Sequence, residues 1–245
     1  MKWRRFGGPL PDVHVTGSQI LSGSLPLECI TVESSALRFS VRILKALASI
    51  EINPKVLKGP WDHGYALDVH TLSSTLIGYD SYGHALFDTT YSAVGGLLYR
   101  LKSKQDISVV PDLVRAIERL WAAVPRPSVD LIIPIPATKL RKHPPVLLVA
   151  RALSGRVKVP PCTDCVAKIK QTSQLKDLVE YDKRMAALDG AFVVTTAKTQ
   201  GKDILLFDDL YRSGATASVI TKLLKIEGKA KSVQLLTLTR TRSKS

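Results

Sequence analysis

The sequence is poor in cysteine and has no long apolar run. It contains three cysteines, Cys29, Cys162 and Cys165, and this odd, low number argues against a disulfide framework and is typical of a reducing compartment. No stretch of 18 or more apolar residues occurs, which excludes a membrane-spanning helix. We therefore expect a soluble, cytoplasmic protein. We interpret Cys162-Thr-Asp-Cys165 as a pair of free thiols, ahead of a zinc or redox role.

Acidic residues are also few. The chain of 245 residues has 21 Asp and Glu against 35 Lys and Arg, which gives a formal net charge of +14. Such an excess favours polyanionic partners, namely nucleic acid, an anionic membrane surface or phosphorylated small molecules. The alternative is a solvated basic surface that has no particular partner.

The second half of the chain alternates between strand and helix patterns. Strands are predicted over 129–135, 191–194, 203–207 and 233–238, and helices over 146–153 and 217–226. A short strand over 157–159 and a long polar loop over 161–189 lie between them. Strands that alternate with helices form right-handed crossovers, so we predict an α/β fold with a mostly parallel sheet flanked by helices.

The first half is less regular, and we divide the whole chain into three parts. Residues 1–59 are predicted to form an N-terminal arm and a helix. Residues 60–91 contain short β-prone runs separated by Gly and Asp, which indicate a small antiparallel unit. Residues 92–245 open with two predicted helices and continue into the α/β pattern, so they form the core.

The segment that carries chemical information runs from Ile204 to Thr216. An apolar strand leads into Asp208 and Asp209, then into a turn of small residues, and then into a helix. In an open parallel sheet ligands bind beyond the carboxyl ends of the strands, and a helix N-terminus offers unpaired N–H groups to a phosphate. Gly214 allows close approach of the backbone, while the carboxylates accept hydrogen bonds from sugar hydroxyls. The segment therefore predicts a site for a phosphorylated ribose. The alternative is that the two acids merely cap a helix.

This segment resembles the 5-phosphoribosyl diphosphate (PRPP) motif of type I phosphoribosyltransferases. Within that superfamily, residues 92 to 240 most resemble the ComF-like branch. Supporting similarities occur in the same order along the chain, at Tyr99-Arg-Leu-Lys102, Ile132-Ile-Pro-Ile-Pro136, Lys170-Gln-Thr-Ser-Gln174 with Asp182-Lys-Arg184, and Gly190-Ala-Phe-Val-Val194. The chain lacks the four-cysteine zinc module with which many relatives begin, and it has Arg212 and Ser213 where many have two threonines.

The resemblance implies a type I phosphoribosyltransferase fold and a magnesium-dependent pentosyl (glycosyl) transfer from PRPP with release of diphosphate. Asp208 and Asp209 would be the catalytic acids. The phosphate of PRPP would be bound by Tyr211, Arg212, Ser213, Gly214, Ala215 and Thr216, and its diphosphate by Ala137, Thr138 and Lys139. Lys170, Gln174 and Arg184 would lie on a flexible loop that closes over the site. Residues 60–91 would form a hood-like unit that recognises the acceptor, and its polar set is His63, Asp68, His70, His84 and Asp88. The alternative, which we favour for these five residues, is that they have ordinary roles in turns and edge strands.

Two other functions stay open. A non-catalytic ComF-like protein would bind single-stranded DNA or other nucleic acid during DNA uptake or processing, which the charge of +14 favours. A sensor would bind PRPP or a nucleotide without turnover. We also consider a homodimer.

Overall fold

The computed structural model describes residues 50–124, 128–137, 142–170 and 181–242. These residues belong to one compact unit, Ala48–Ser245. Most of the predicted N-terminal arm, 1–59, lies outside the described residues, as does the segment 171–180. In the described ranges no helix is both long enough and apolar enough to cross a membrane.

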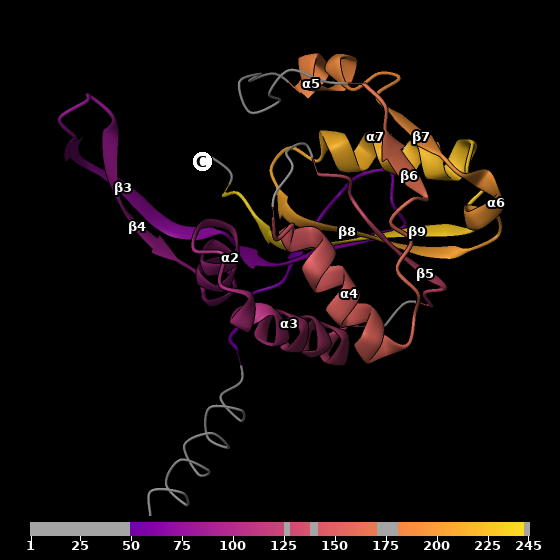
Figure 1. The fold of residues 1–245 in the computed structure, drawn as a ribbon, viewed down its shortest axis with the longest axis horizontal. Helices are drawn as coiled ribbons and strands as arrows, with labels where there is room; N and C mark the ends of the chain where they lie inside the picture. The colour runs from indigo at the N-terminus through magenta and orange to yellow at the C-terminus, as the bar shows by residue number, and fades with distance from the viewer. Residues whose placement is uncertain (1–49, 125–127, 138–141, 171–180, 243–245) are drawn as a thin grey trace, which may run out of the picture. The chain divides into compact units, whose positions relative to one another are not determined.

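The centre of this unit is a five-stranded sheet with the order β1-β2-β9-β8-β5 (Figure 1). Its strands are β1 (Lys55–Val56), β2 (His63–Val69), β9 (Ser232–Arg240), β8 (Asp203–Tyr211) and β5 (Leu131–Pro134). β2, β9, β8 and β5 run parallel, and only the two-residue β1 is antiparallel to its neighbour. The prediction of an α/β fold with a mostly parallel sheet flanked by helices is confirmed.

Helices cover both faces of this sheet (Figure 1). One face packs on α2 (Ala93–Ser103), α3 (Val110–Ala123) and α4 (Pro145–Val157), and a 3₁₀ turn, η1 (Ile107–Val109), joins the first two. The other face packs on α7 (Ala215–Ile226). Side chains of a strand alternate between faces, so Leu205 and Phe207 of β8 join the first core and Ile204 and Leu206 the second.

A smaller layer lies beside α7. β6 (Val166–Lys168) pairs antiparallel with β7 (Phe192–Val194), and α5 (Tyr181–Ala187) and α6 (Thr196–Thr199) accompany them. The sequence predicts one long loop over 161–189, and this prediction is wrong for β6 and α5. Both elements are short, and β6 gains its hydrogen bonds only from β7, which lies more than twenty residues further along the chain.

The predicted antiparallel unit over 60–91 is correct only in its second part. Residues 63–69 form β2 of the main sheet, where they run parallel to β9. Ala66 and Leu67 of β2 are fully buried, because this strand is covered by side chains on both faces. The antiparallel pairing is confined to a hairpin of β3 (Thr71–Tyr79) and β4 (Ala85–Tyr91), whose far end extends away from the sheet (Figure 1).

The expectation of two free thiols is also wrong, because Cys162 and Cys165 form a disulfide. The chain turns here between the edge of β5 and the start of β6. The Cys162 N–H donates to the Ile132 carbonyl at 2.8 Å, and Cys165 is fully buried just before β6. This turn brings the two Cα atoms to 5.5 Å, which lies within the range that a disulfide spans.

Candidate functional site

The polar residues of interest lie where the parallel strands end. β8 ends with Asp208 to Tyr211, β9 ends at Arg240, and β2 is followed directly by His70. β5 is followed by Ile135, whose N–H donates to the Phe207 carbonyl at 2.8 Å, so the ends of β5 and β8 lie together. The carboxyl ends of all four strands therefore share one edge of the sheet, which is the usual ligand-binding edge of this architecture.

The side chains of Asp208 and Asp209 lie on opposite faces of β8. Asp209 continues the series of Leu205 and Phe207, and its Oδ1 accepts from Lys102 Nζ of α2 at 2.9 Å. Asp208 continues the series of Leu206 on the side of α7, and its Oδ1 accepts the Asp209 backbone N–H at 2.8 Å. The two acids therefore have different surroundings, a lysine for Asp209 and the turn before α7 for Asp208.

The Asp208 carboxyl is costly to ionise. Burial, and secondly the charge of Asp209, raise the pKa of Asp208 to about 8, although the Asp209 N–H and Lys102 act in the opposite direction. The free protein therefore keeps a proton on this pair at neutral pH. A ligand that brings positive charge or several hydroxyl donors to Asp208 would favour its ionised form.

Three more residues complete the cluster: Lys102 and Thr239, which were not predicted site residues, and His70, which was predicted only for recognition of the acceptor. Lys102 is bonded to Asp209, and the Thr239 hydroxyl lies 3.4 Å from the Asp209 carbonyl oxygen and 3.3 Å from His70 Nδ1. Burial, and then the charge of Lys102, lower the pKa of His70, so this imidazole is neutral at pH 7. Lys102 belongs to the segment Tyr99-Arg-Leu-Lys102, which resembles the ComF-like branch. That resemblance was the one feature of the sequence that pointed to this lysine.

The turn after β8 is shaped around Gly214. This residue has φ of +76°, in the left-handed region, and a Cβ atom there would lie 2.4 Å from the Tyr211 hydroxyl oxygen. The Tyr211 ring is held in turn by an edge contact with Trp61, at 6.1 Å between centroids. Gly214 is therefore required both by the backbone and by the ring that lies over it.

α7 begins directly after this turn and presents its first N–H groups there. The N-cap residue of α7 is Gly214, which has no side chain to cap the helix, and the first turn contains no acidic residue. The Ala215 N–H donates a long hydrogen bond of 3.5 Å to Ser213 Oγ. An open helix N-terminus attracts anions through its N–H groups and its dipole. The strand–turn–helix that the sequence predicts is present, and Ser213, Gly214, Ala215 and Thr216 lie at it.

The other predicted site residues are placed as follows. Tyr211 is the last residue of β8 rather than part of the turn, and Arg212 is exposed, close enough for its charge to lower the pKa of His70. Ala137 is exposed just beyond β5, and the Lys170 ammonium lies 3.5 Å from the Asp189 carbonyl oxygen. Thr138, Lys139 and Gln174 are outside the described residues, as is the side chain of Arg184 in α5.

The residues present fit a magnesium ion at this edge. Asp208 and Asp209 supply hard carboxylate oxygens, and Lys102 is bonded to Asp209. Magnesium prefers oxygen ligands, and it usually binds through one or two carboxylates together with phosphate groups of a substrate. These two carboxylates would hold the ion, directly or through the ligand's hydroxyls.

Gly214 gives a first prediction. Gly214→Ala is expected to weaken phosphate and PRPP binding by about ten-fold or more, because the methyl group must displace Tyr211 and the backbone strain is about 1–2 kcal/mol. Gly190→Ala is the matched control, since Gly190 has φ of +60° but open space around its Cβ position. Titration with PRPP compares the affinities of the two variants, and urea unfolding compares their stabilities. Together the two measurements distinguish the effect of displacing the Tyr211 ring from the effect of backbone strain. Unchanged binding in Gly214→Ala would contradict this account of the turn.

The fold and this edge define an α/β protein with a candidate site for a phosphorylated ligand. No family model matches the chain, and no curated protein is similar to it. Solved structures that are similar include adenine phosphoribosyltransferase from Saccharomyces cerevisiae, complexed with an imino-sugar bisphosphate and adenine. It is 13% identical with a TM-score of 0.37 over 69% of this chain and 84% of that one.

Two further structures are similar to a comparable degree. The adenine phosphoribosyltransferase from Thermoanaerobacter pseudethanolicus is 15% identical, with a TM-score of 0.35 over 69% of this chain and 94% of that one. The glutamine PRPP amidotransferase from B. subtilis, complexed with ADP and GMP, is 14% identical, with a TM-score of 0.36 over 62% of this chain and 28% of that one. At this identity and TM-score the similarity assigns no activity to the chain.

Proposed function

We propose that the chain binds PRPP at the carboxyl end of β8 and transfers its phosphoribosyl group to an acceptor, as a ComF-like phosphoribosyltransferase that uses magnesium. The observation that carries this proposal is the segment from Asp208 to Thr216. In nine residues it combines a half-buried carboxyl of raised pKa, a left-handed glycine and the start of α7. A sugar that bears both hydroxyls and a phosphate matches these groups together.

The reacting groups would be arranged along this edge. The 5-phosphate of PRPP would accept hydrogen bonds from the N–H groups of residues 213–216, and its ribose hydroxyls would donate to Asp208. A nitrogen nucleophile attacks the anomeric carbon, whose bond to oxygen breaks so that diphosphate leaves with the electron pair. The carboxylates stabilise the positive charge that develops on the ribose, and Lys102 holds Asp209 in place through its hydrogen bond. Magnesium, when bound, supplies positive charge to the phosphate oxygens.

Proton release gives a second prediction. At pH 7 the free protein holds a proton at Asp208, whose pKa is raised to about 8, and the bound sugar requires the carboxylate. Binding of PRPP with magnesium is therefore expected to release about one proton per site at pH 7 and fewer above pH 9. Calorimetric titration in HEPES and in Tris, which differ in ionisation enthalpy, measures this number, with Asp208→Asn as the control that releases none. Equal enthalpies in both buffers for the unmodified protein would contradict the assignment.

Turnover is tested by diphosphate release. The full chain with PRPP, magnesium and each of a panel of acceptors (adenine, hypoxanthine, orotate and ammonia) is expected to release diphosphate with at least one of them. Lys102→Met is expected to lower the rate about ten-fold or more, because Asp209 loses its partner. PRPP binding without release for any acceptor would favour a sensor over a transferase.

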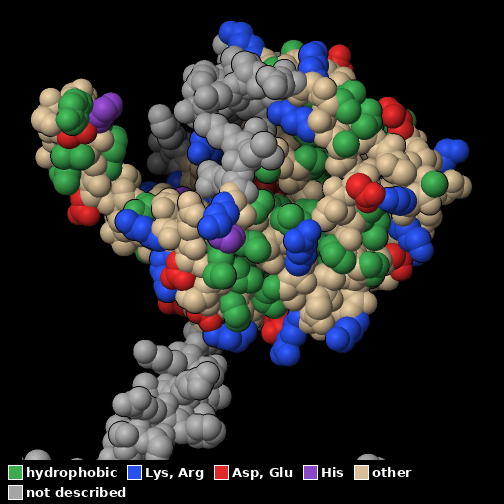
Figure 2. All heavy atoms as spheres, in the orientation of Figure 1, with side chains coloured by type: hydrophobic (Ala, Val, Ile, Leu, Met, Phe, Trp, Pro, Cys, Tyr) green, Lys and Arg blue, Asp and Glu red, His purple; other side chains and the backbone are tan. Residues whose placement is uncertain are grey.

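Nucleic-acid binding is a second candidate, which the net charge of +14 favours. Basic side chains are distributed over the face of the described part that Figure 2 shows, whereas residues 71–91 contain no Lys or Arg. If this function is correct, single-stranded DNA binds with an affinity that falls steeply with salt. Fluorescence anisotropy of a labelled oligonucleotide tests it, and Asp208→Asn/Asp209→Asn is expected to leave this binding unchanged.

A further inference from the structure

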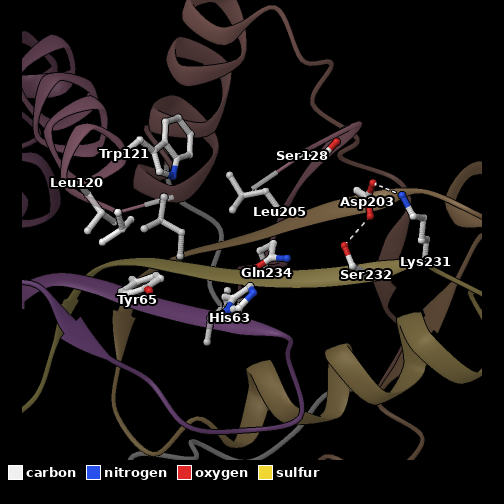
Figure 3. Close-up of a pocket in the computed structure, with 13 residues that line it drawn as sticks. His63, Tyr65, Leu120, Trp121, Ser128, Asp203, Leu205, Lys231, Ser232 and Gln234 are labelled. Atoms are coloured by element: carbon white, nitrogen blue, oxygen red, sulfur yellow. Dashed lines mark hydrogen bonds and ion pairs between the residues drawn. The ribbon is translucent and has the colours of Figure 1, made fainter. Parts of the chain in front are cut away.

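A cavity lies at the edge of the sheet opposite the candidate PRPP site. It is lined by the residues with which the parallel strands begin, including His63 of β2, Asp203 of β8 and Ser232 of β9 (Figure 3). Its volume is about 350 Å³. Asp203 and Asp208 are separated by five residues of extended strand, roughly 16 Å. This cavity is therefore distinct from the candidate PRPP site.

The walls of the cavity are apolar and partly aromatic. Leu205 and Leu236 of the sheet and Leu120 of α3 supply aliphatic surface. The Trp121 indole at the end of α3 and the Tyr65 ring on β2 stand at its sides (Figure 3). A lining that combines aromatic rings with aliphatic side chains fits a planar ring system. A volume of this size lies at the small end of ligand pockets, so it suits a nucleobase or a nucleoside.

Gln234 supplies the polar group of this cavity. Its side chain lines the cavity and is 7% exposed, and its Oε1 has no hydrogen-bond partner among the described residues. A buried amide oxygen without a partner costs roughly 1–3 kcal/mol. The terminal torsion of glutamine is soft, so a small rotation turns Oε1 toward the cavity. A ligand with an N–H donor would satisfy it.

The charges around the cavity are already compensated. Asp203 accepts from Ser232 Oγ at 2.7 Å and from Lys231 Nζ at 2.9 Å, and these hydrogen bonds, that of Ser232 first, lower the pKa of Asp203. His63 is exposed at the start of β2. The cavity thus presents no uncompensated charge from these residues, which favours a neutral ligand over a phosphorylated one.

We propose that this cavity binds a neutral, planar nitrogen heteroaromatic compound of the nucleobase class, which stacks on Trp121 and donates an N–H to Gln234. The site is separate from the PRPP site and does not depend on the proposed transfer. A base bound there would contact β8 and β9 at their starts, and the same two strands carry the candidate site at their ends.

The test uses the full chain and four free bases, adenine, hypoxanthine, cytosine and uracil, each up to millimolar concentration. Binding of at least one base is expected by calorimetry, with NMR shifts at Trp121 and Gln234. Gln234→Leu keeps the shape but removes the amide, and it is expected to weaken binding about ten-fold. Gln200→Leu is the control, because Gln200 is exposed. Val124→Trp fills the cavity from the end of α3 and is expected to abolish binding, so the test does not depend on one variant folding.

Each outcome decides the proposal. Base binding that is weakened about ten-fold in Gln234→Leu and abolished in Val124→Trp, but retained in Asp208→Asn/Asp209→Asn, supports it even if PRPP does not bind. Failure of every base to bind the unmodified protein overturns it. Binding that disappears in the double aspartate variant but survives in Val124→Trp also overturns it, because the base would then occupy the carboxyl edge of the sheet as an acceptor.

Discussion

Replacing Asp208 and Asp209 together by asparagine is expected to lower the affinity for PRPP with magnesium by about a hundred-fold or more. Hydrogen bonds to charged groups contribute roughly 1.5–3 kcal/mol each, and this change removes the charge from both acceptors. It also removes the attraction between Asp209 and Lys102. Isothermal calorimetry of the two proteins under identical conditions measures the difference.

The control for this experiment is Asp189→Asn, because Asp189 is exposed and lies outside the carboxyl edge of the sheet. Its affinity for PRPP is expected to equal that of the unmodified protein. The unfolding temperature of each variant establishes that it is folded. A double variant that binds PRPP within about three-fold of the unmodified protein would show that these carboxylates do not contact the ligand.

Asp208→Asn alone is expected to make the ligand-free protein more stable at pH 8. Burial and Asp209 raise the pKa of Asp208 to about 8, far above the value of 3.8 for an unperturbed Asp. A carboxyl whose pKa is raised by folding binds its proton more tightly in the native state than in the unfolded state. Its contribution to stability is therefore complete below pH 3.8 and is lost as the pH rises toward 8.

Asparagine carries no charge at any pH, so the variant avoids this loss. We expect the free energy of unfolding of Asp208→Asn at pH 8 to exceed that of the unmodified protein by at least about 1 kcal/mol. The difference should shrink as the pH is lowered from 8 to 5. Urea unfolding at several pH values, without ligand, provides the comparison. A variant that is less stable than the unmodified protein at pH 8 would contradict the raised pKa.

The sequence was sufficient to predict those parts of the site that are local. The change from an apolar strand to two acids, a glycine turn and a helix occupies one short segment, and the structure contains that segment as a continuous strand–turn–helix. Its boundaries were less predictable. β8 continues four residues beyond the predicted end at 207, because Asp208, Leu210 and Tyr211 pair with β9. The predicted strand over 157–159 is absent, since α4 runs to Val157 and ends at the left-handed Lys158.

Contacts between distant segments were not predictable from one sequence. Lys102 and Asp209 are 107 residues apart, and His70 reaches Thr239 across 169 residues. Local patterns also cannot tell which strand will be a neighbour, so β2 was assigned to an antiparallel unit although it completes the parallel sheet beside β9. The Gln234 amide is hidden from sequence reasoning for the same reason. Glutamine within an apolar strand signals nothing until its surroundings are known.

A crystal structure of the full chain with PRPP and magnesium is the most direct test of the proposed PRPP site. We expect density for the 5-phosphate at the N–H groups of residues 213–216, beside Gly214, and for the ribose hydroxyls at Asp208. Density for PRPP elsewhere on the protein, or none at a concentration that saturates known PRPP sites, would contradict the assignment of this edge of the sheet.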